Sequence, residues 1–245
     1  MWTYPPAHVV VAVDFGEASA QAVALAAAIA AAGGGRLTLV HAETLEAPPY
    51  FTADQIDAIE HQRIAAREEA RRYLTRFGQR RTGGHPFAAE IVDGPPAEAV
   101  LRAGAAADLI AMGTHGRRGP GRWWMGSVAE RVLRRTGVPL LVTHGDAGRE
   151  PAAVFQRLLP AGDGAVRERV TRYARALAGS FGGTALDGAD GDVGEAARRQ
   201  AATLVLVGLG ADERRRGLDA TERLLRSCTL PTLFLLEREH EPAPR

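Results

Sequence analysis

Strand-like and helix-like patterns alternate from residue 9 to residue 142, and this alternation restricts the chain to few folds. Short apolar runs predict strands at residues 9–13, 37–41, 87–92, 109–112 and 139–142, with helices at residues 18–32, 54–77, 97–106 and 127–135. Strands joined by helices form a mostly parallel sheet that is covered on both faces, with right-handed crossovers. We therefore predict an α/β fold with a doubly wound, Rossmann-like sheet of five strands in the order 3-2-1-4-5.

A polar segment at residues 145–151 contains glycine, ends in proline and is typical of a linker. It predicts a first domain over residues 1–145 and a second domain over residues 152–245. In the second domain we expect strands at residues 154–159, 204–207 and 233–236, and helices at residues 164–178, 195–202 and 218–227.

The second domain repeats parts of the first. Residues 108–113 match residues 203–208, and residues 138–142 match residues 230–234. Between residues 178 and 195 only one short segment is strand-like, which indicates that a strand and the long helix are missing. We expect a truncated, degenerate second copy of the same fold.

A glycine-rich loop follows the fourth predicted strand. Gly113-Thr114-His115-Gly116 comes directly after the apolar run, and Gly126-Ser127 begins the next helix. Backbone N–H groups in such a loop, together with the N-terminus of a helix, bind phosphate. Asp14 ends the first strand, and in the order 3-2-1-4-5 the ends of the first and fourth strands flank the point where strand order reverses. The sequence therefore predicts a nucleotide site there.

The spacing G-x2-G-x9-G-S resembles that of the ATP-binding subgroup of the universal stress protein family. Val13-Asp14-Phe15, Leu39-Val40-His41-Ala42 and Asp93-Gly94-Pro95-Pro96 extend the resemblance, which covers residues 8–143 well and residues 152–236 weakly. It implies the following nucleotide contacts: Asp14 to adenine and ribose, Ala42 to the adenine edge through its backbone, Gly113 and Gly116 close to ribose and phosphates, and Gly126, Ser127 and Val128 to phosphate oxygens. The implied cofactor is ATP with Mg²⁺ or Mn²⁺.

Simpler interpretations of these residues stay open. Asp14 and Ser127 could serve only as helix caps, and Gly113 and Gly116 could form only a tight loop. The loop also carries side chains for which ligand binding and a purely structural or solvated role are both open: His115, Arg117, Arg118, Arg122, Trp123 and Trp124.

The second domain is expected to bind no nucleotide. Leu218 and Asp219 align with Gly126 and Ser127, so a carboxylate stands where phosphate would bind. The resemblance also implies pairing through last strands. That pairing could join residues 140–142 to residues 233–235 inside one chain as a pseudo-dimer, or join two chains in a homodimer.

Composition excludes several functions. All thirty basic residues are arginine, so a P-loop lysine, Schiff-base chemistry and a catalytic lysine are excluded. The formal net charge of +1 favours neither nucleic acid nor a membrane as partner. The single cysteine, Cys228, excludes an internal disulfide and a multi-thiolate metal site. Together with the absence of a signal-peptide pattern, this composition predicts a cytoplasmic location.

The expected function is regulatory. Because lysine and an evident general base are lacking near the loop, we expect no catalytic residues and at most slow ATP hydrolysis. The seven histidines are scattered, with no pair at metal-ligand spacing, so we expect no protein metal ligands. We expect an ATP-binding protein of the stress response that contacts an unknown protein partner. The alternatives are a nucleotide-independent interaction module of the same fold and, less favoured, an adenylyl transferase.

Overall fold

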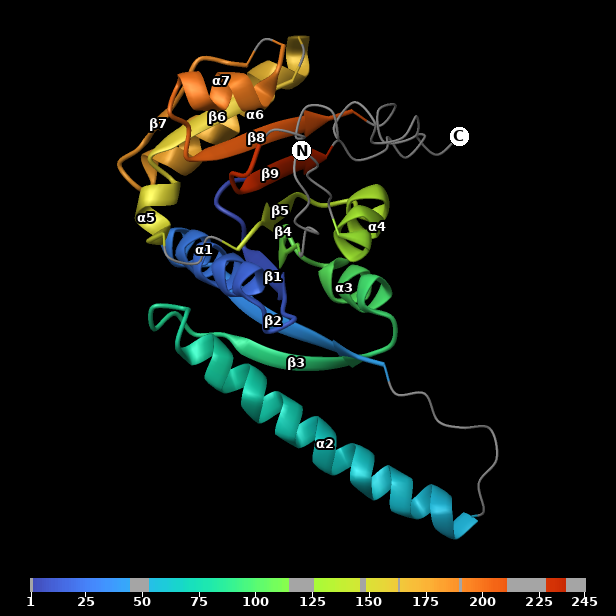
Figure 1. Cartoon of the computed structure of the whole chain (residues 1–245). Coiled ribbons are helices and arrows are strands. Elements are labelled where there is room, and N and C mark those ends of the chain that lie inside the picture. Colours follow the sequence, from blue (N-terminus) through green and yellow to red (C-terminus); the bar gives the residue numbers. More distant parts are fainter. Residues whose placement is uncertain are drawn as a thin grey trace, which may run out of the picture.

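The computed structural model describes residues 2–44, 53–114, 126–145, 149–162, 164–189, 191–210 and 228–236, with only the backbone described for residues 53–61. Its strands form a single nine-stranded sheet in the order β3-β2-β1-β4-β5-β9-β8-β6-β7 (Figure 1). The first five strands give the predicted doubly wound order, and the predicted α/β fold is confirmed.

The first half of the sheet follows the expected alternation. Its elements are β1 (His8–Ala12), α1 (Glu17–Gly33), β2 (Arg36–Glu43), α2 (Ala53–Gln79), β3 (Ala88–Asp93), α3 (Pro96–Gly104), β4 (Leu109–Gly113), α4 (Ser127–Arg135) and β5 (Leu140–Thr143). All four neighbouring strand pairs in this half are parallel.

The second half begins differently from the prediction. Its elements are α5 (Pro151–Val154), β6 (Arg157–Ala161), α6 (Gly164–Gly179), β7 (Thr184–Ala185), α7 (Val193–Arg199), β8 (Leu204–Leu209) and β9 (Thr232–Leu236). The strand expected at residues 154–159 starts only at Arg157, because Pro151 opens a short helix that includes Val154. The helix expected at residues 218–227 lies outside the described residues.

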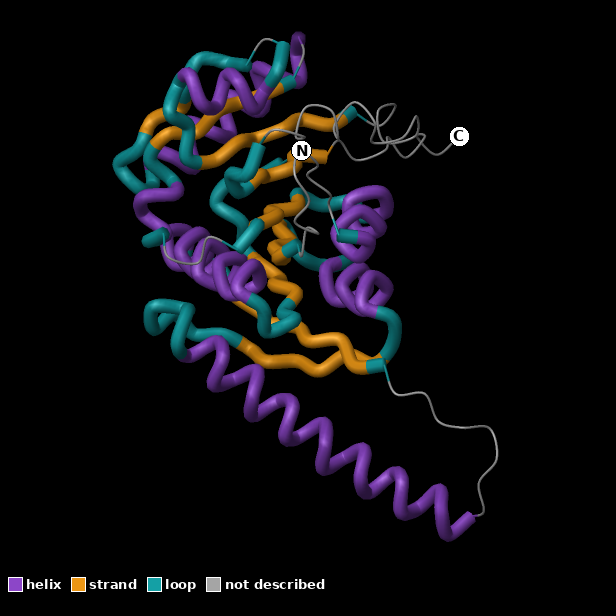
Figure 2. The backbone as a smooth tube through the Cα atoms, in the orientation of Figure 1, coloured by secondary structure: helices purple, strands orange, loops and turns teal. Residues whose placement is uncertain are grey.

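Helices cover both faces of the sheet (Figure 2). On one face, side chains of α1, α2 and α6 share a buried apolar cluster with the sheet. On the other face, side chains of α3, α4 and α7 share a second cluster. The sheet therefore runs through the whole molecule between two apolar layers, and no described helix is long and apolar enough to cross a membrane.

The two halves have the same strand pairing. β6 pairs in parallel with β7 and β8, and β8 with β9, just as β1 pairs with β2 and β4, and β4 with β5. The hydrogen bond from the Ile110 amide to the Pro139 carbonyl (2.9 Å) recurs between Val205 and Pro231 (3.1 Å). A strand corresponding to β3 is absent from the described residues of the second half.

An antiparallel pair, β5 with β9, joins the halves. Leu140 lies opposite Phe234, Leu141 opposite Leu233 and Val142 opposite Thr232. This pairing inside one chain is one of the two alternatives that the sequence left open.

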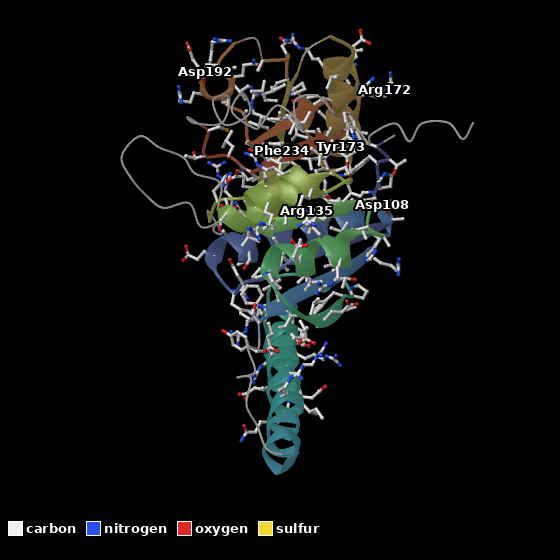
Figure 3. The ribbon with its side chains drawn as sticks, turned by 90° about the vertical axis from the view of Figure 1, so that its right-hand side faces the viewer. Asp108, Arg135, Arg172, Tyr173, Asp192 and Phe234 are labelled. Atoms are coloured by element: carbon white, nitrogen blue, oxygen red, sulfur yellow. The ribbon has the colours of Figure 1, made fainter. Side chains whose placement is uncertain are left out.

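The N-terminal segment also spans the junction. The Trp2 indole N–H donates to the Leu236 carbonyl, and the Tyr4 ring packs edge-on against Tyr173 of α6, with ring centroids 5.5 Å apart. The Asp108 carboxylate, ahead of β4, accepts hydrogen bonds from the backbone N–H groups of Ala7 and His8 at 3.0 and 2.9 Å. Asp108 and Tyr173 are labelled in Figure 3. The chain start is thus fixed to both halves of the sheet.

Candidate functional site

The carboxyl ends of β1 and β4 lie side by side. Ala12 is paired with Met112 at the end of the β1–β4 ladder, so Asp14 and Gly113 both follow at the same edge of the sheet. β2 lies on the other side of β1, and strand order reverses between β1 and β4. Ligands of doubly wound sheets bind at such a point.

Asp14 is exposed and its carboxylate orders the turn into α1. Its Oδ1 accepts a hydrogen bond from the Gly16 amide at 2.9 Å. Gly16 itself is the N-cap of α1, and within the described part of the chain no side chain caps that helix. Asp14 therefore stabilises the turn before the helix. It does not act as the N-cap, so the simpler interpretation of this residue was wrong.

An aromatic cluster packs around Phe15 in the same turn. Phe15 has φ +65°, a left-handed conformation that is unusual for a bulky residue. Its ring packs against His41 and Tyr73, with centroids 4.5 and 4.6 Å away. His41 Nδ1 donates to the Val13 carbonyl at 2.7 Å, so the histidine has a structural role. The sequence analysis missed the cluster. Its only signal was the aromatic character of positions 15, 41 and 73, which does not show that they lie together.

Gly113 is required by packing. A Cβ at this position would lie 2.3 Å from the Ser19 backbone nitrogen and 2.5 Å from the Ala18 carbonyl carbon. The first turn of α1 therefore lies directly against the end of β4, where only glycine fits. Contact between Gly113 and a ligand stays a prediction.

Thr114 connects the end of β4 to the start of α4. Its amide donates to the Thr143 carbonyl at 2.9 Å, and its Oγ1 accepts from the Gly126 amide at 2.7 Å. Thr114 is only 4% exposed. The sequence analysis missed this residue, since a threonine between two predicted site residues gave no separate signal. Gly116 and the remaining residues of the loop, 115–125, lie outside the described residues.

The N-terminus of α4 faces this edge with few internal partners. Gly126 is the N-cap, and no side chain of the described residues caps the helix. The first intrahelical bond runs from the Glu130 amide to the Gly126 carbonyl at 2.9 Å. The amides of Ser127 and Val128 precede it and have no intrahelical acceptor, and the positive end of the helix dipole favours an anion. The Gly126 amide, by contrast, is already used by Thr114.

Ala42 lies where β2 extends past its neighbour. β1 and β2 are paired only as far as Ala12 and Val40, whereas Ala42 is paired with Val92 of β3. Beyond Val40, no strand of the described residues therefore lies on the β1 side of β2. The structure brings six predicted residues to one edge of the sheet: Asp14, Ala42, Gly113, Gly126, Ser127 and Val128.

Buried polar groups complete the neighbouring strand end. The Thr143 hydroxyl donates to the Ala18 carbonyl at 2.6 Å, which ties β5 to the start of α1. Burial lowers the pKa of His144 to about 4, against a smaller opposing effect of a hydrogen bond with the Leu230 backbone. Burial raises the pKa of the Cys228 thiol, so this group is a poor nucleophile.

Among the described residues no group of three or more His, Cys, Asp or Glu side chains is placed to hold a metal ion.

Comparison with known proteins identifies the first half. Residues 7–144 match the Universal stress protein family. A Thermus aquaticus protein, described as a universal stress protein in the QAH/OAS sulfhydrylase 3' region, is 32% identical over 138 residues, which are 56% of this chain and 97% of that protein.

Two solved structures share the fold over nearly the whole chain. A universal stress protein from Archaeoglobus fulgidus superposes with a TM-score of 0.62 at 17% identity, over 97% of this chain and 98% of its own. A functionally unknown protein from Pseudomonas aeruginosa gives a TM-score of 0.62 at 14% identity, over 95% and 93% of the two chains. Taken with the strand order and the match over residues 7–144, these comparisons establish that the chain belongs to the universal stress protein family.

Proposed function

We propose that the chain binds one adenine nucleotide, as ATP with Mg²⁺ or Mn²⁺, at the carboxyl ends of β1 and β4. The observation that carries the proposal is the position of the α4 N-terminus, which the Thr114–Gly126 hydrogen bond ties to the end of β4, at the same edge of the sheet as the exposed Asp14 carboxylate. A fixed, uncapped helix start next to the point of strand reversal suits a phosphate group.

The residues at this edge fit the proposed ligand in part. The amides of Ser127 and Val128 are suited to phosphate oxygens, whereas the Gly126 amide would have to give up Thr114 to bind one. Asp14 and the backbone of Ala42 are the proposed ribose and adenine contacts. A divalent ion would offset phosphate charge in a chain without lysine.

We propose a regulatory role in the stress response, in which nucleotide binding alters contact with a protein partner. Slow hydrolysis is the most that the site supports, because the Asp14 carboxylate is already bound to the Gly16 amide and no lysine is available. An interaction module that uses no nucleotide is the second candidate. It is favoured by Gly113, whose glycine is explained by packing alone.

The second half is proposed to be a degenerate copy without a nucleotide. Matching strand registers support the duplication, as does Gly208, where a Cβ would lie 2.3 Å from Val166 Cγ1 just as one at Gly113 would meet α1. At the end of β6, Arg167 donates to the carbonyls of Gly162 (2.7 Å) and Ala189 (3.4 Å). A guanidinium thus lies at the carboxyl end of β6, the strand that corresponds to β1 in the proposed duplication.

Calorimetric titration of nucleotide-stripped protein tests the proposal. ATP with magnesium should bind with a stoichiometry near one, and AMP, ADP and cyclic AMP should be tested as competitors. Gly126→Asp should abolish binding, because a carboxylate at the helix start repels phosphate. Ser180→Asp, an exposed change at the end of α6, is the control with the same added charge. Absence of binding by a folded wild-type protein would favour the nucleotide-independent module.

A further inference from the structure

Phe15 has an unusual backbone conformation beside the proposed nucleotide site. It directly follows Asp14, and its φ of +65° lies in the left-handed region, which a bulky side chain disfavours. Among the non-glycine residues that the structure describes, only Ala201 shares a positive φ. Such a conformation persists where the surrounding structure fixes it, and it is frequent at functional sites. The contacts of Phe15 therefore decide how the turn after β1 is held.

Three aromatic side chains contact the Phe15 ring. The ring centroids of His41 in β2 and of Tyr73 and Phe77 in α2 lie 4.5, 4.6 and 5.4 Å away. The two α2 rings meet Phe15 edge-on, at interplanar angles of 67° and 81°, which is a preferred arrangement of aromatic pairs. Tyr73 and Phe77 are four residues apart and so lie on one face of α2. Helix α2 thus supports Phe15 with two rings at once.

The supporting rings are themselves anchored. Phe77 is buried, and the Arg81 guanidinium lies 3.7 Å from the centre of its ring and donates to its carbonyl at 3.0 Å. His41 Nδ1 donates to the Val13 carbonyl at 2.7 Å. Val13 precedes Asp14 in the chain, so His41 contacts the residues on both sides of Asp14. The aromatic cluster therefore holds the turn at two points.

Open space also borders this turn. Phe15, Gly16 and Glu17 line a cavity of about 1090 Å³, whose other walls are residues of α1 and residues 80–86 and 149–151. Asp14 itself is exposed. A turn that borders open space has room to change its backbone conformation. The ring contacts with α2 and β2 are thus needed to keep Phe15 at a positive φ.

The backbone of Phe15 sets the position of the Asp14 carboxylate. The hydrogen bond from the Gly16 amide to Asp14 Oδ1 (2.9 Å) spans Phe15, so it depends on the φ and ψ angles of that residue. A return of Phe15 to the usual negative φ would move the Gly16 amide away from the carboxylate. The side chain proposed to contact ribose is therefore oriented by a neighbour that packs on α2.

We propose that Phe15, Tyr73 and Phe77 are positioning residues of the nucleotide site. Their ring contacts keep the turn after β1 in the left-handed conformation in which the Asp14 carboxylate meets the nucleotide. The inference rests on the proposed function, because these residues act on the nucleotide only through Asp14. Helix α2 then contributes to nucleotide affinity although it supplies no proposed ligand.

A double-mutant cycle tests this role. ATP affinity is measured by calorimetry with magnesium for the wild type, Tyr73→Ala, Asp14→Ala and the double variant. Tyr73 is 51% exposed, so its truncation should leave the protein folded. Tyr73→Ala should weaken ATP binding at least about fivefold in the wild type but less than about twofold in the Asp14→Ala background, because the ring acts through the carboxylate. Tyr73→Phe, which retains the ring, should bind ATP like the wild type.

Two further comparisons separate the ring from the backbone and from general effects on α2. Ile64→Ala is the matched control, since Ile64 is a large apolar residue of α2 that is 56% exposed and lies outside the cluster, and it should leave ATP affinity unchanged. Phe15→Ala and Phe15→Gly both lose the ring contacts and should weaken ATP binding. The glycine variant should have the higher melting temperature, because glycine adopts a positive φ without penalty.

Hydrogen exchange of the Gly16 amide, measured by NMR without nucleotide, distinguishes this inference from the proposed function. Exchange should be at least about tenfold faster in Tyr73→Ala than in the wild type, because the acceptor at Asp14 is no longer held. Wild-type binding of ATP with equal affinity in Tyr73→Ala, or an equal loss in both backgrounds of the cycle, would overturn the inference and leave the proposed function standing. If the wild type binds no nucleotide, the proposed function fails, whereas faster Gly16 exchange in Tyr73→Ala still supports a cluster that holds Asp14 and unchanged exchange overturns it.

Discussion

Leu141 and Leu233 face one another across the antiparallel β5–β9 pair, and they hold corresponding places in the two halves of the sheet. Leu141 is paired with Ala111 of β4 on its other side, and Leu233 with Leu206 of β8. The residues on either side of the two leucines are paired crosswise: the residue before Leu141, Leu140, lies opposite the residue after Leu233, Phe234, and Val142 lies opposite Thr232. A local two-fold relation therefore passes through this pair of leucines, and both are buried.

The β5–β9 pair should make the halves unfold together. Leu233→Ala leaves a cavity in the shared core and should lower the free energy of unfolding by about 2–5 kcal/mol. Urea unfolding followed by circular dichroism should show a single transition at a lower midpoint. Two resolved transitions, with the first half unaffected, would show that the halves fold separately.

Thr114 should control the proposed nucleotide site. Thr114→Val keeps the shape of the side chain but removes the acceptor of the Gly126 amide, so the start of α4 loses its connection to β4. We expect at least a tenfold weaker affinity for ATP and a stability loss of about 1 kcal/mol. Thr114→Ser, which retains the hydroxyl, should bind ATP like the wild type. Equal affinity for the valine and serine variants would argue against the connection.

Gly113→Ala and Gly208→Ala should differ in cost. A Cβ at Gly113 would meet backbone atoms of α1, which cannot turn aside, whereas one at Gly208 would meet the side chain of Val166. We expect the larger drop in melting temperature for Gly113→Ala. Adding Val166→Ala should restore part of the stability lost in Gly208→Ala. An unchanged melting temperature for Gly113→Ala would contradict the close packing.

Stability should fall in acid because of His144. Its pKa is about 4 in the folded protein and about 6.5 in an unfolded chain, so between these values the unfolded state binds the additional proton. The stability from the neutral side chain is present above pH 6.5 and is lost as pH falls towards 4, by at most about 1.4 kcal/mol per pH unit. Urea midpoints measured between pH 7.5 and 4.5 should therefore fall less steeply for His144→Gln.

Much of the fold could be predicted from the sequence, because the apolar periodicity of each element and the residues that end it indicate the same boundaries. The order of β1 to β5 came from apolar runs separated by helical patterns. The helix predicted at residues 18–32 ends one residue later, at Gly33, and its C-cap Gly34 has φ +66°. The predicted start of β6 was wrong by three residues, since the apolar run from Val154 does not reveal that Pro151, ahead of it, opens a helix that includes Val154.

The candidate site was harder to predict than the fold. Asp14, Ala42 and Ser127 could be assigned to one edge, because parallel strands end together. The packing requirement at Gly113 depends on how closely α1 approaches, which no local pattern encodes. The role of Thr114 depends likewise on two partners, Thr143 and Gly126, that are distant in sequence.

Because β5 and β9 belong to one chain, their pairing does not depend on protein concentration. Two separate subunits joined through their last strands come apart on dilution, with a midpoint set by their dissociation constant. Here both strands belong to one polypeptide, so their encounter is a first-order event with a fixed effective concentration. The continuous nine-stranded sheet should therefore persist at the lowest copy number at which the gene product occurs.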